Sequence, residues 1–301
     1  MVSRCIPTDS HTQVLVQSQR PPQSRADVVF VHGLEGGGNA GYIVSMAHAC
    51  LSSGFATHRF HMRTCGGTER LTNTLYHAGL TSDLRVFLQR REDLAGPVFL
   101  VGFSLGGNVV LKLAGELGEA AATMFSGVCA ISTPIDLGAC ARRMRKRDNS
   151  LYERRFVKRM RDRLIATGRY TREHFREASS IYAIDDVVTA PSFGFGTADR
   201  YYESQSAKRF LDAIRVPTLI IQAKDDTFIP FAIFDHPAFR ENPFLTLLAT
   251  EYGGHLGFLQ RRGRRRFWID EVVTEWIDRL LSAGSSRSAG GMDELNSIPA
   301  V

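Results

Sequence analysis

A serine that could act as a nucleophile lies between two glycines at residues 102–106, whose sequence is Gly-Phe-Ser-Leu-Gly. An apolar run at residues 97–101 precedes the motif, and apolar residues at helical spacing follow it from Val109. On a tight turn between a strand and a helix, a serine hydroxyl is exposed at the end of the sheet. Chance alone yields this short motif roughly 0.2 times in a chain of this composition, so the rest of the sequence must support the interpretation. Ser104 is the first candidate for a catalytic residue.

A serine hydroxyl is a weak nucleophile at neutral pH, so it needs a base and a group that orients the base. His255, in a glycine-rich loop, is the predicted base. Asp225 and Asp226 directly follow the apolar run 218–223 and compete for the role of the acid. We favour Asp226, because hydrolases that use this arrangement usually place the acid four residues before the proline of the next element, here Pro230. Asp225 stays open as the alternative.

Acyl transfer by a serine also needs two backbone N–H groups that face the developing negative charge. The N–H of Leu105, directly after the serine, is the first predicted donor. The N–H of Leu34 is the second, because residues 32–38 (His-Gly-Leu-Glu-Gly-Gly-Gly) follow an early apolar run, where such a loop belongs. These residue types together predict nucleophilic catalysis at an acyl group.

The predicted strands and helices that must position these residues alternate along the chain. Apolar runs alternate with segments in which apolar residues recur at helical spacing. This alternation predicts an α/β fold with a mostly parallel central sheet and helices on both faces. We assign the helical apolar stripes to the core, including a final helix from Trp268 to Leu280. Strands are expected at residues 13–16, 27–32, 56–62, 98–102, 128–132, 218–223 and 245–250.

The chain has 301 residues, which suits one α/β domain that carries an insertion. The alternation breaks at residues 137–216, which are first arginine-rich and helical, then rich in glycine and aromatic residues. An insertion there would lie over the carboxyl ends of the strands, so we predict a helical lid. We expect an N-terminal segment at 1–25, the catalytic domain at 26–281 and a disordered tail at 282–301.

The composition favours a cytoplasmic protein. No apolar run is long enough to cross a membrane, and the first residues lack the apolar core of a signal peptide. The five cysteines form no Cys-x-x-Cys pair and are odd in number, so we expect no structural disulfide.

Six blocks of the sequence resemble the YheT-like branch of the α/β-hydrolases, in order and over residues 26–281. The resemblance implies a serine esterase or lipase that acts on short- and medium-chain acyl esters and acylglycerols without a cofactor or metal. It also implies a triad of Ser104, Asp226 and His255, in the chain order that α/β-hydrolases use. The blocks are residues 32–36, 63–67, 75–79, 102–108, 225–226 and 253–258, and Tyr201-Tyr202 matches the tyrosine pair of the group.

Two features depart from this group. Thr64 stands where the group usually has glycine, which puts the shape of the loop near Cys65 in doubt. The strands before residue 26 look shorter than usual. Substrate preference therefore does not transfer from the resemblance.

Other side chains that could take part in catalysis or metal binding have simpler interpretations. His58 and His61 have a His-x-x-His spacing that also occurs in metal sites. On a strand the two side chains would lie on opposite faces, so we predict no metal site. His77 is predicted to form hydrogen bonds within its loop. The pair Asp185-Asp186 is interpreted as a solvated or helix-capping pair.

The net charge of +6 is concentrated in residues 142–163, which hold eleven basic residues, and in residues 261–266, which hold five arginines. A solvated helical face is the simplest interpretation. Leu151, Phe156 and Met160 keep approximate helical spacing, so attraction to anionic membrane surfaces is the main alternative. We predict no binding of nucleic acid, because no recognition motif accompanies the arginines.

The sequence therefore predicts a hydrolase that cleaves small acyl esters through an acyl intermediate on Ser104. Two alternatives stay open. The same acyl-enzyme could transfer its acyl group to an alcohol or amine, and the chain could instead be a non-catalytic module that binds membranes. The oligomeric state is not predicted.

Overall fold

A single eight-stranded sheet organises the molecule. The structure is a computed structural model that describes residues 1–261 and 265–287. The strand order is β1-β2-β4-β3-β5-β6-β7-β8, in which β1, β2 and β4 pair antiparallel and all other neighbours pair parallel. The strands are β1 Val2–Asp9, β2 Thr12–Gln19, β3 Asp27–Val31, β4 Ala56–Phe60, β5 Val98–Phe103, β6 Gly127–Ile131, β7 Thr218–Ala223 and β8 Leu245–Thr250.

The first two strands differ most from the sequence prediction. β1 was not predicted, because Ile6 is its one buried residue among the eight and no apolar alternation marks it. As an edge strand it needs little buried surface. β2 is longer than the expected strand at residues 13–16, since it covers eight residues, and β1 covers eight as well. Residues 2–19 therefore belong to the central sheet.

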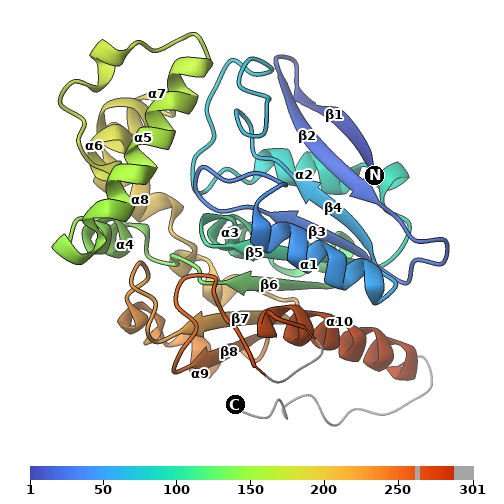
Figure 1. Cartoon of the computed structure of the whole chain (residues 1–301). Helices are drawn as coiled ribbons and strands as arrows, with labels where there is room; N and C mark the ends of the chain where they lie inside the picture. Colours follow the sequence, from blue (N-terminus) through green and yellow to red (C-terminus); the bar gives the residue numbers. More distant parts are fainter. Residues whose placement is uncertain (262–264, 288–301) are drawn as a thin grey trace.

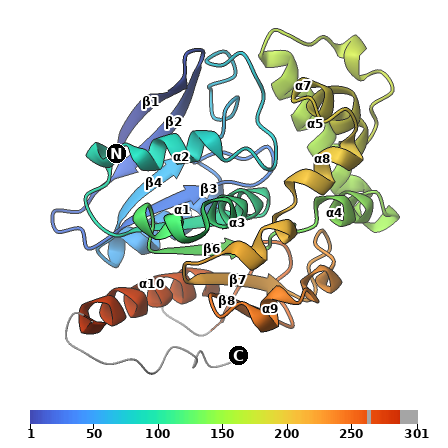
Figure 2. The same cartoon turned by 180° about the vertical axis from the view of Figure 1, so that it is seen from behind.

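Helices cover both faces of the sheet, as predicted (Figures 1 and 2). On one face α1 and α10 pack against Phe30, Phe99 and Val101 of the inner strands, and α2 and α3 pack on the other. The helices are α1 Gly41–Ser52, α2 Ser82–Gln89, α3 Leu105–Leu117, α4 Leu137–Met144, α5 Ser150–Ala166, α6 Ile181–Ile184, α7 Ala190–Ser192, α8 Ala198–Gln205, α9 Ala238–Glu241 and α10 Trp268–Arg287. A π-helical turn, η5, covers Asp185–Thr189, and short 3-10 turns cover Arg91–Asp93, Gly118–Thr123, Arg147–Asn149, Arg172–Phe175, Ala207–Arg209, Leu211–Ala213 and Phe231–Phe234.

Helix α10 continues beyond the predicted end of the domain at residue 281. It extends to Arg287, so the predicted tail begins inside a helix, and residues 288–301 lie outside the described residues. The apolar stripe stops at Leu281, which is why the sequence pattern loses the helix there. No helix of the described residues is long and apolar enough to cross a membrane. All five cysteines are free thiols.

Residues 137–216 form a group of helices, α4 to α8, at the end of the sheet to which the arrows of β6 and β7 point (Figure 1). We call this group the helical segment. It has a small core of its own, built from Met144, Val157, Met160, Leu164, Phe175, Ile181, Ile184 and Val188 together with Leu75. The helical segment therefore lies beside the carboxyl ends of the parallel strands, where open α/β sheets bind ligands.

Candidate active site

Ser104 occupies a strained turn between β5 and α3. Its φ is 51° and its ψ is −121°, a conformation that residues with a side chain rarely adopt. A Cβ added to Gly102 would overlap the carbonyl oxygen of Gly106, and one added to Gly106 would overlap that of Val31. The turn therefore requires glycine on both sides of the serine, which is the physical reason for the motif.

The structure brings Ser104 together with two residues from distant loops. His255 Nε2 lies 3.1 Å from Ser104 Oγ, and His255 Nδ1 lies 2.9 Å from Asp226 Oδ2. The hydrogen bond at Nδ1 orients the imidazole so that Nε2 faces the serine hydroxyl. A serine hydroxyl, an imidazole and a carboxylate thus stand in one continuous chain of hydrogen bonds, an arrangement that can activate a hydroxyl for nucleophilic attack.

The two neighbouring aspartates after β7 have different partners. The side chain of Asp226 is fully buried, and its Oδ1 accepts from the N–H groups of Phe228 and Ile229 at 2.8 and 3.2 Å. Asp225 is exposed and accepts from the N–H of Gly254 at 2.8 Å. Asp226 therefore contacts the imidazole of His255, whereas Asp225 contacts the backbone of its loop.

The predicted donors Leu34 and Leu105 belong to two segments next to Ser104 in the fold. A Cβ added to Gly33 would lie 3.1 Å from Ser104 Cβ, so the loop of Leu34 lies directly against Ser104. Leu105 is the first residue of α3, where an N–H has no partner within the helix and the helix dipole favours negative charge. No backbone hydrogen bond found for the described part of the chain uses either N–H.

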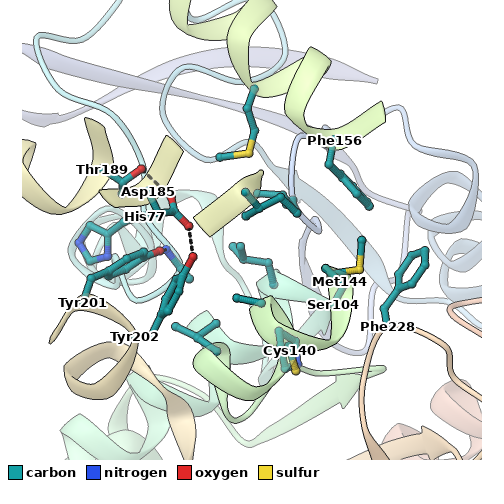
Figure 3. A pocket seen from close by; sticks show the side chains of 18 of the residues that line it. His77, Ser104, Cys140, Met144, Phe156, Asp185, Thr189, Tyr201, Tyr202 and Phe228 are labelled. Carbon is teal, nitrogen blue, oxygen red and sulfur yellow. Dashed lines mark hydrogen bonds between the residues drawn. The ribbon is translucent and has the colours of Figure 1, made fainter. Parts of the chain in front are cut away.

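Ser104 and His255 line two hollows that meet at the serine. The first has a volume of about 110 Å³, and its lining residues are mostly apolar. Figure 3 shows Phe156, Met144 and Phe228 on the side of Ser104, and a group of polar side chains on the opposite side. The second is a larger, open hollow of about 760 Å³ along the glycine-rich loop, with Asn39, Tyr42 and His61.

Asp185 is a pocket residue that the sequence interpretation missed. It is buried rather than solvated, and its carboxylate accepts from the hydroxyls of Tyr202 at 2.6 Å and Thr189 at 2.7 Å (Figure 3). Burial raises the pKa of Asp185 to about 6. Capping applies only to its neighbour Asp186, which accepts from the N–H of Ala198 at the start of α8. The one local signal in the sequence is Thr189, because side chains four residues apart on a helix lie close enough to form a hydrogen bond.

The three other histidines considered in the sequence have structural partners. His58 contacts the Asp27 carboxylate at 2.8 Å, and His61 accepts from the N–H of Gly38. His77 Nδ1 accepts from the N–H of Gly79 at 3.2 Å, and burial lowers the pKa of His77 to about 3. Within the described ranges, no group of three or more His, Cys, Asp or Glu side chains is placed to hold a metal ion.

The prediction of a solvated face for the basic stretch is wrong at two arginines of α5. The Arg163 side chain is only 10% exposed and pairs with the carboxylate of Glu35, at 2.9 Å. Arg161 donates to the carbonyl oxygens of Phe175 and Ala178. Lys158, in contrast, is exposed and pairs with Asp162 four residues on.

Comparisons with known proteins agree with the fold described above. The family model described as "alpha/beta hydrolase fold" matches residues 28–261. The chain is 31% identical to the "Putative esterase YheT" of Escherichia coli, covering 90% of this chain and 82% of the relative. It is 28% identical to the "Medium-chain fatty acid ethyl ester synthase/esterase 2" of Saccharomyces cerevisiae, covering 84% of this chain and 62% of the relative.

The solved structures agree on the fold. The esterase Pf2001 of Pyrococcus furiosus has a TM-score of 0.60 at 16% identity, with 92% of each chain covered. At this identity the likeness concerns the arrangement of the sheet and helices alone. The eight-stranded sheet, the serine turn and the two sequence comparisons lead to one conclusion: the chain belongs to the α/β-hydrolase family, in the branch that resembles YheT.

Proposed function

We propose that this α/β-hydrolase is a serine carboxylesterase that cleaves short- to medium-chain acyl esters through an acyl-Ser104 intermediate. The observation that carries the proposal is the chain of hydrogen bonds from Asp226 through His255 to Ser104. The esterase and ester synthase/esterase names of the two relatives support it.

The geometry suits the following sequence of steps. Ser104 Oγ attacks the ester carbonyl while His255 Nε2 accepts its proton, and Asp226 stabilises the imidazolium that forms. The N–H groups of Leu34 and Leu105 donate to the oxyanion. His255 then donates the proton to the departing alcohol. Water activated by the same histidine releases the acid and regenerates Ser104.

The first hollow is the proposed acyl site. Its lining is mostly apolar and its volume is about 110 Å³. A protein cavity of roughly 150 Å³ holds a benzene ring, so the hollow matches a short acyl chain. The larger, open hollow along the glycine-rich loop is the proposed exit for the alcohol. A series of p-nitrophenyl esters of increasing acyl length tests this assignment.

Hydrolysis of p-nitrophenyl butyrate by single variants tests the triad. By comparison with measured triads, Ser104→Ala should lower kcat by roughly 10⁶-fold and Asp226→Asn by roughly 10⁴-fold. His255→Ala should resemble the serine variant. Asp225→Asn is the matched control and should lose far less, because Asp225 contacts only the backbone of the histidine loop. Full activity of Ser104→Ala would disprove the proposal, and a loss confined to Asp225→Asn would transfer the acid role to that residue.

Acyl transfer to an alcohol is a second candidate activity. It is favoured by the open hollow beside Ser104, which could admit an acceptor alcohol, and by the yeast relative named as an ester synthase as well as an esterase. Product analysis in the presence of ethanol separates the two activities. Ethyl ester would support transfer, and free acid alone would support hydrolysis.

We also propose that the helical segment acts as a lid that contacts anionic lipid surfaces. Leu151 and Tyr152 of α5 are 75% and 51% exposed. The Tyr152 ring lies 4.9 Å from that of Phe228, which lies 4.6 Å from the ring of His255, so this apolar surface borders the site. Salt-sensitive sedimentation with phosphatidylglycerol vesicles, lost in Leu151→Ser/Tyr152→Ser, would support this role. Equal binding to phosphatidylcholine vesicles would contradict it. A cytoplasmic location stays a prediction.

A further inference from the structure

Side chains from distant segments hold the loop that carries the Leu34 N–H. The next residue, Glu35, is buried and has a φ of 54°. Its N–H donates to the hydroxyl oxygen of Tyr76 at 3.0 Å, and its carbonyl oxygen accepts from Arg159 Nη2 at 2.6 Å. A positive φ crowds the Cβ of a residue other than glycine, so such a conformation persists only where its surroundings hold it. The backbone beside Leu34 is therefore fixed by tertiary contacts.

Arg163 of α5 makes most of the contacts to the Glu35 side chain. Its Nε donates to both carboxylate oxygens at 2.9 Å, and its guanidinium lies 4.7 Å from the centre of the Tyr76 ring. Tyr76 also donates its hydroxyl to Glu35 Oε1 at 3.0 Å. The side chains of Arg163 and Glu35 are only 10% and 3% exposed, so water screens this pair weakly.

Thr64 extends the network to a third segment. It is buried, its φ is 61°, and its Oγ1 accepts from Arg163 Nη1 at 2.8 Å. Positive φ is a pronounced outlier for a β-branched residue, whereas glycine adopts it readily. What threonine adds at this position is a hydroxyl that accepts a hydrogen bond from Arg163.

We propose that Arg163 is a positioning residue for the oxyanion hole, a role that rests on the proposed esterase function. By binding Glu35, Tyr76 and Thr64 together, it holds the Leu34 N–H against Ser104. Because Arg163 belongs to α5, it also couples the position of the helical segment to the loop that carries the Leu34 N–H. Displacing a catalytic group by about 1 Å lowers a rate by up to about 10²-fold, so loss of this contact should slow the chemical step.

The decisive variant is the double substitution Glu35→Gln/Arg163→Met. It removes both charges together, because a single substitution would leave the other charge buried and unpaired. We expect kcat for p-nitrophenyl butyrate to fall about 10- to 100-fold with KM changed less than about threefold, since one oxyanion donor contributes about 10²- to 10³-fold. The affinity for a trifluoromethyl ketone, which forms an oxyanion on Ser104, should fall by the same factor as kcat/KM.

Lys158→Met/Asp162→Asn is the matched control. This double variant removes an exposed ion pair from the same helix and should keep wild-type kcat and inhibitor affinity. Arg163→Lys is the second variant, because an ammonium cannot reach both Glu35 oxygens and Thr64 at once. It should show a smaller loss of kcat, and it decides the question if the double variant does not fold.

The outcomes separate this inference from the proposed function. Wild-type kcat and inhibitor affinity in a folded double variant, or in Arg163→Lys if only that variant folds, would overturn the positioning role. That result would leave the esterase proposal intact as long as Ser104→Ala is inactive. An active Ser104→Ala variant would instead remove the proposed function on which the inference rests.

Discussion

At the scale of single residues, burial decides which polar groups this protein uses and how. Asp225 and Asp226 are adjacent in sequence, yet only the buried Asp226 reaches the imidazole of His255. Asp185 has no cationic partner among its hydrogen bonds, which come from two hydroxyls. A carboxylate held in this way is easier to protonate in the folded protein than in the unfolded chain.

Asp185 should therefore make the free energy of unfolding depend on pH. Its folded pKa of about 6 lies above the unfolded value near 3.8, so the folded state binds the proton more tightly. Its contribution to the free energy of unfolding is present below about pH 4. As the pH rises to about 6 this contribution is lost, which lowers the free energy of unfolding by up to about 3 kcal/mol. Urea unfolding at several pH values should show Asp185→Asn gaining stability relative to wild type over this range. A constant difference between the two proteins would contradict the assignment.

At the scale of elements, buried hydrogen bonds join the helical segment to α3, a helix that packs on the sheet. Asn108 of α3 is fully buried and donates to the carbonyl oxygens of Ala78 and Gln205, both at 2.9 Å. Its side-chain oxygen accepts from the N–H of Ala207 at 2.7 Å. One amide thus connects α3, the loop of Ala78 and the end of α8, and it lies four residues after Ser104 in the chain.

Asn108→Ala should lower both stability and activity. The substitution leaves several buried backbone groups without a partner, so we expect a loss of about 3 kcal/mol in the free energy of unfolding, measured with urea. We also expect kcat to fall, because the loop of Ala78 lines the acyl hollow.

Asn242→Ala is the control for this prediction. Asn242 makes similar side-chain contacts to the carbonyl oxygens of Leu211 and Ile214, but it does not line either hollow beside Ser104. Its variant should be destabilised with kcat retained. Equal loss of kcat in the two variants would assign the effect of Asn108 to general destabilisation.

At the scale of the whole molecule, three buried histidines make the fold sensitive to acid. Burial lowers the pKa of His32 to about 3, that of His61 to about 4 and that of His77 to about 3. Below pH 6.5 the unfolded chain takes up these protons and the folded protein does not. Each histidine should then lower the free energy of unfolding by about 1.4 kcal/mol per pH unit until its folded pKa is reached.

Urea unfolding between pH 7 and pH 4.5 measures this loss. His77→Asn removes one titratable group and should therefore reduce the slope by the share of one histidine. The fold should be kept, because an asparagine oxygen can still accept from the N–H of Gly79. His11→Asn changes an exposed histidine and is the matched control. Identical slopes for wild type and His77→Asn would show that His77 is charged in the folded protein.

Local patterns in the sequence were sufficient for the fold class and for most of the strands. Seven of the eight strands are predicted from the sequence. Buried parallel strands are apolar along most of their length, as in β3, β5 and β6, and the serine turn needs glycines at fixed positions. The same patterns named Ser104 and His255 as candidates and favoured Asp226 over Asp225 as the acid. These features depend on residues that are neighbours in the chain.

Only the tertiary structure decided the features that depend on contacts between distant segments. The contact of Asp226 with His255, the burial of Asp185 beneath Tyr202 and the pairing of Arg163 with Glu35 each join residues from different elements. The edge strand β1 owes its place to pairing with β2 rather than to an apolar pattern. Whether a charged side chain is solvated or buried depends on what packs over it, and that is set by the fold as a whole.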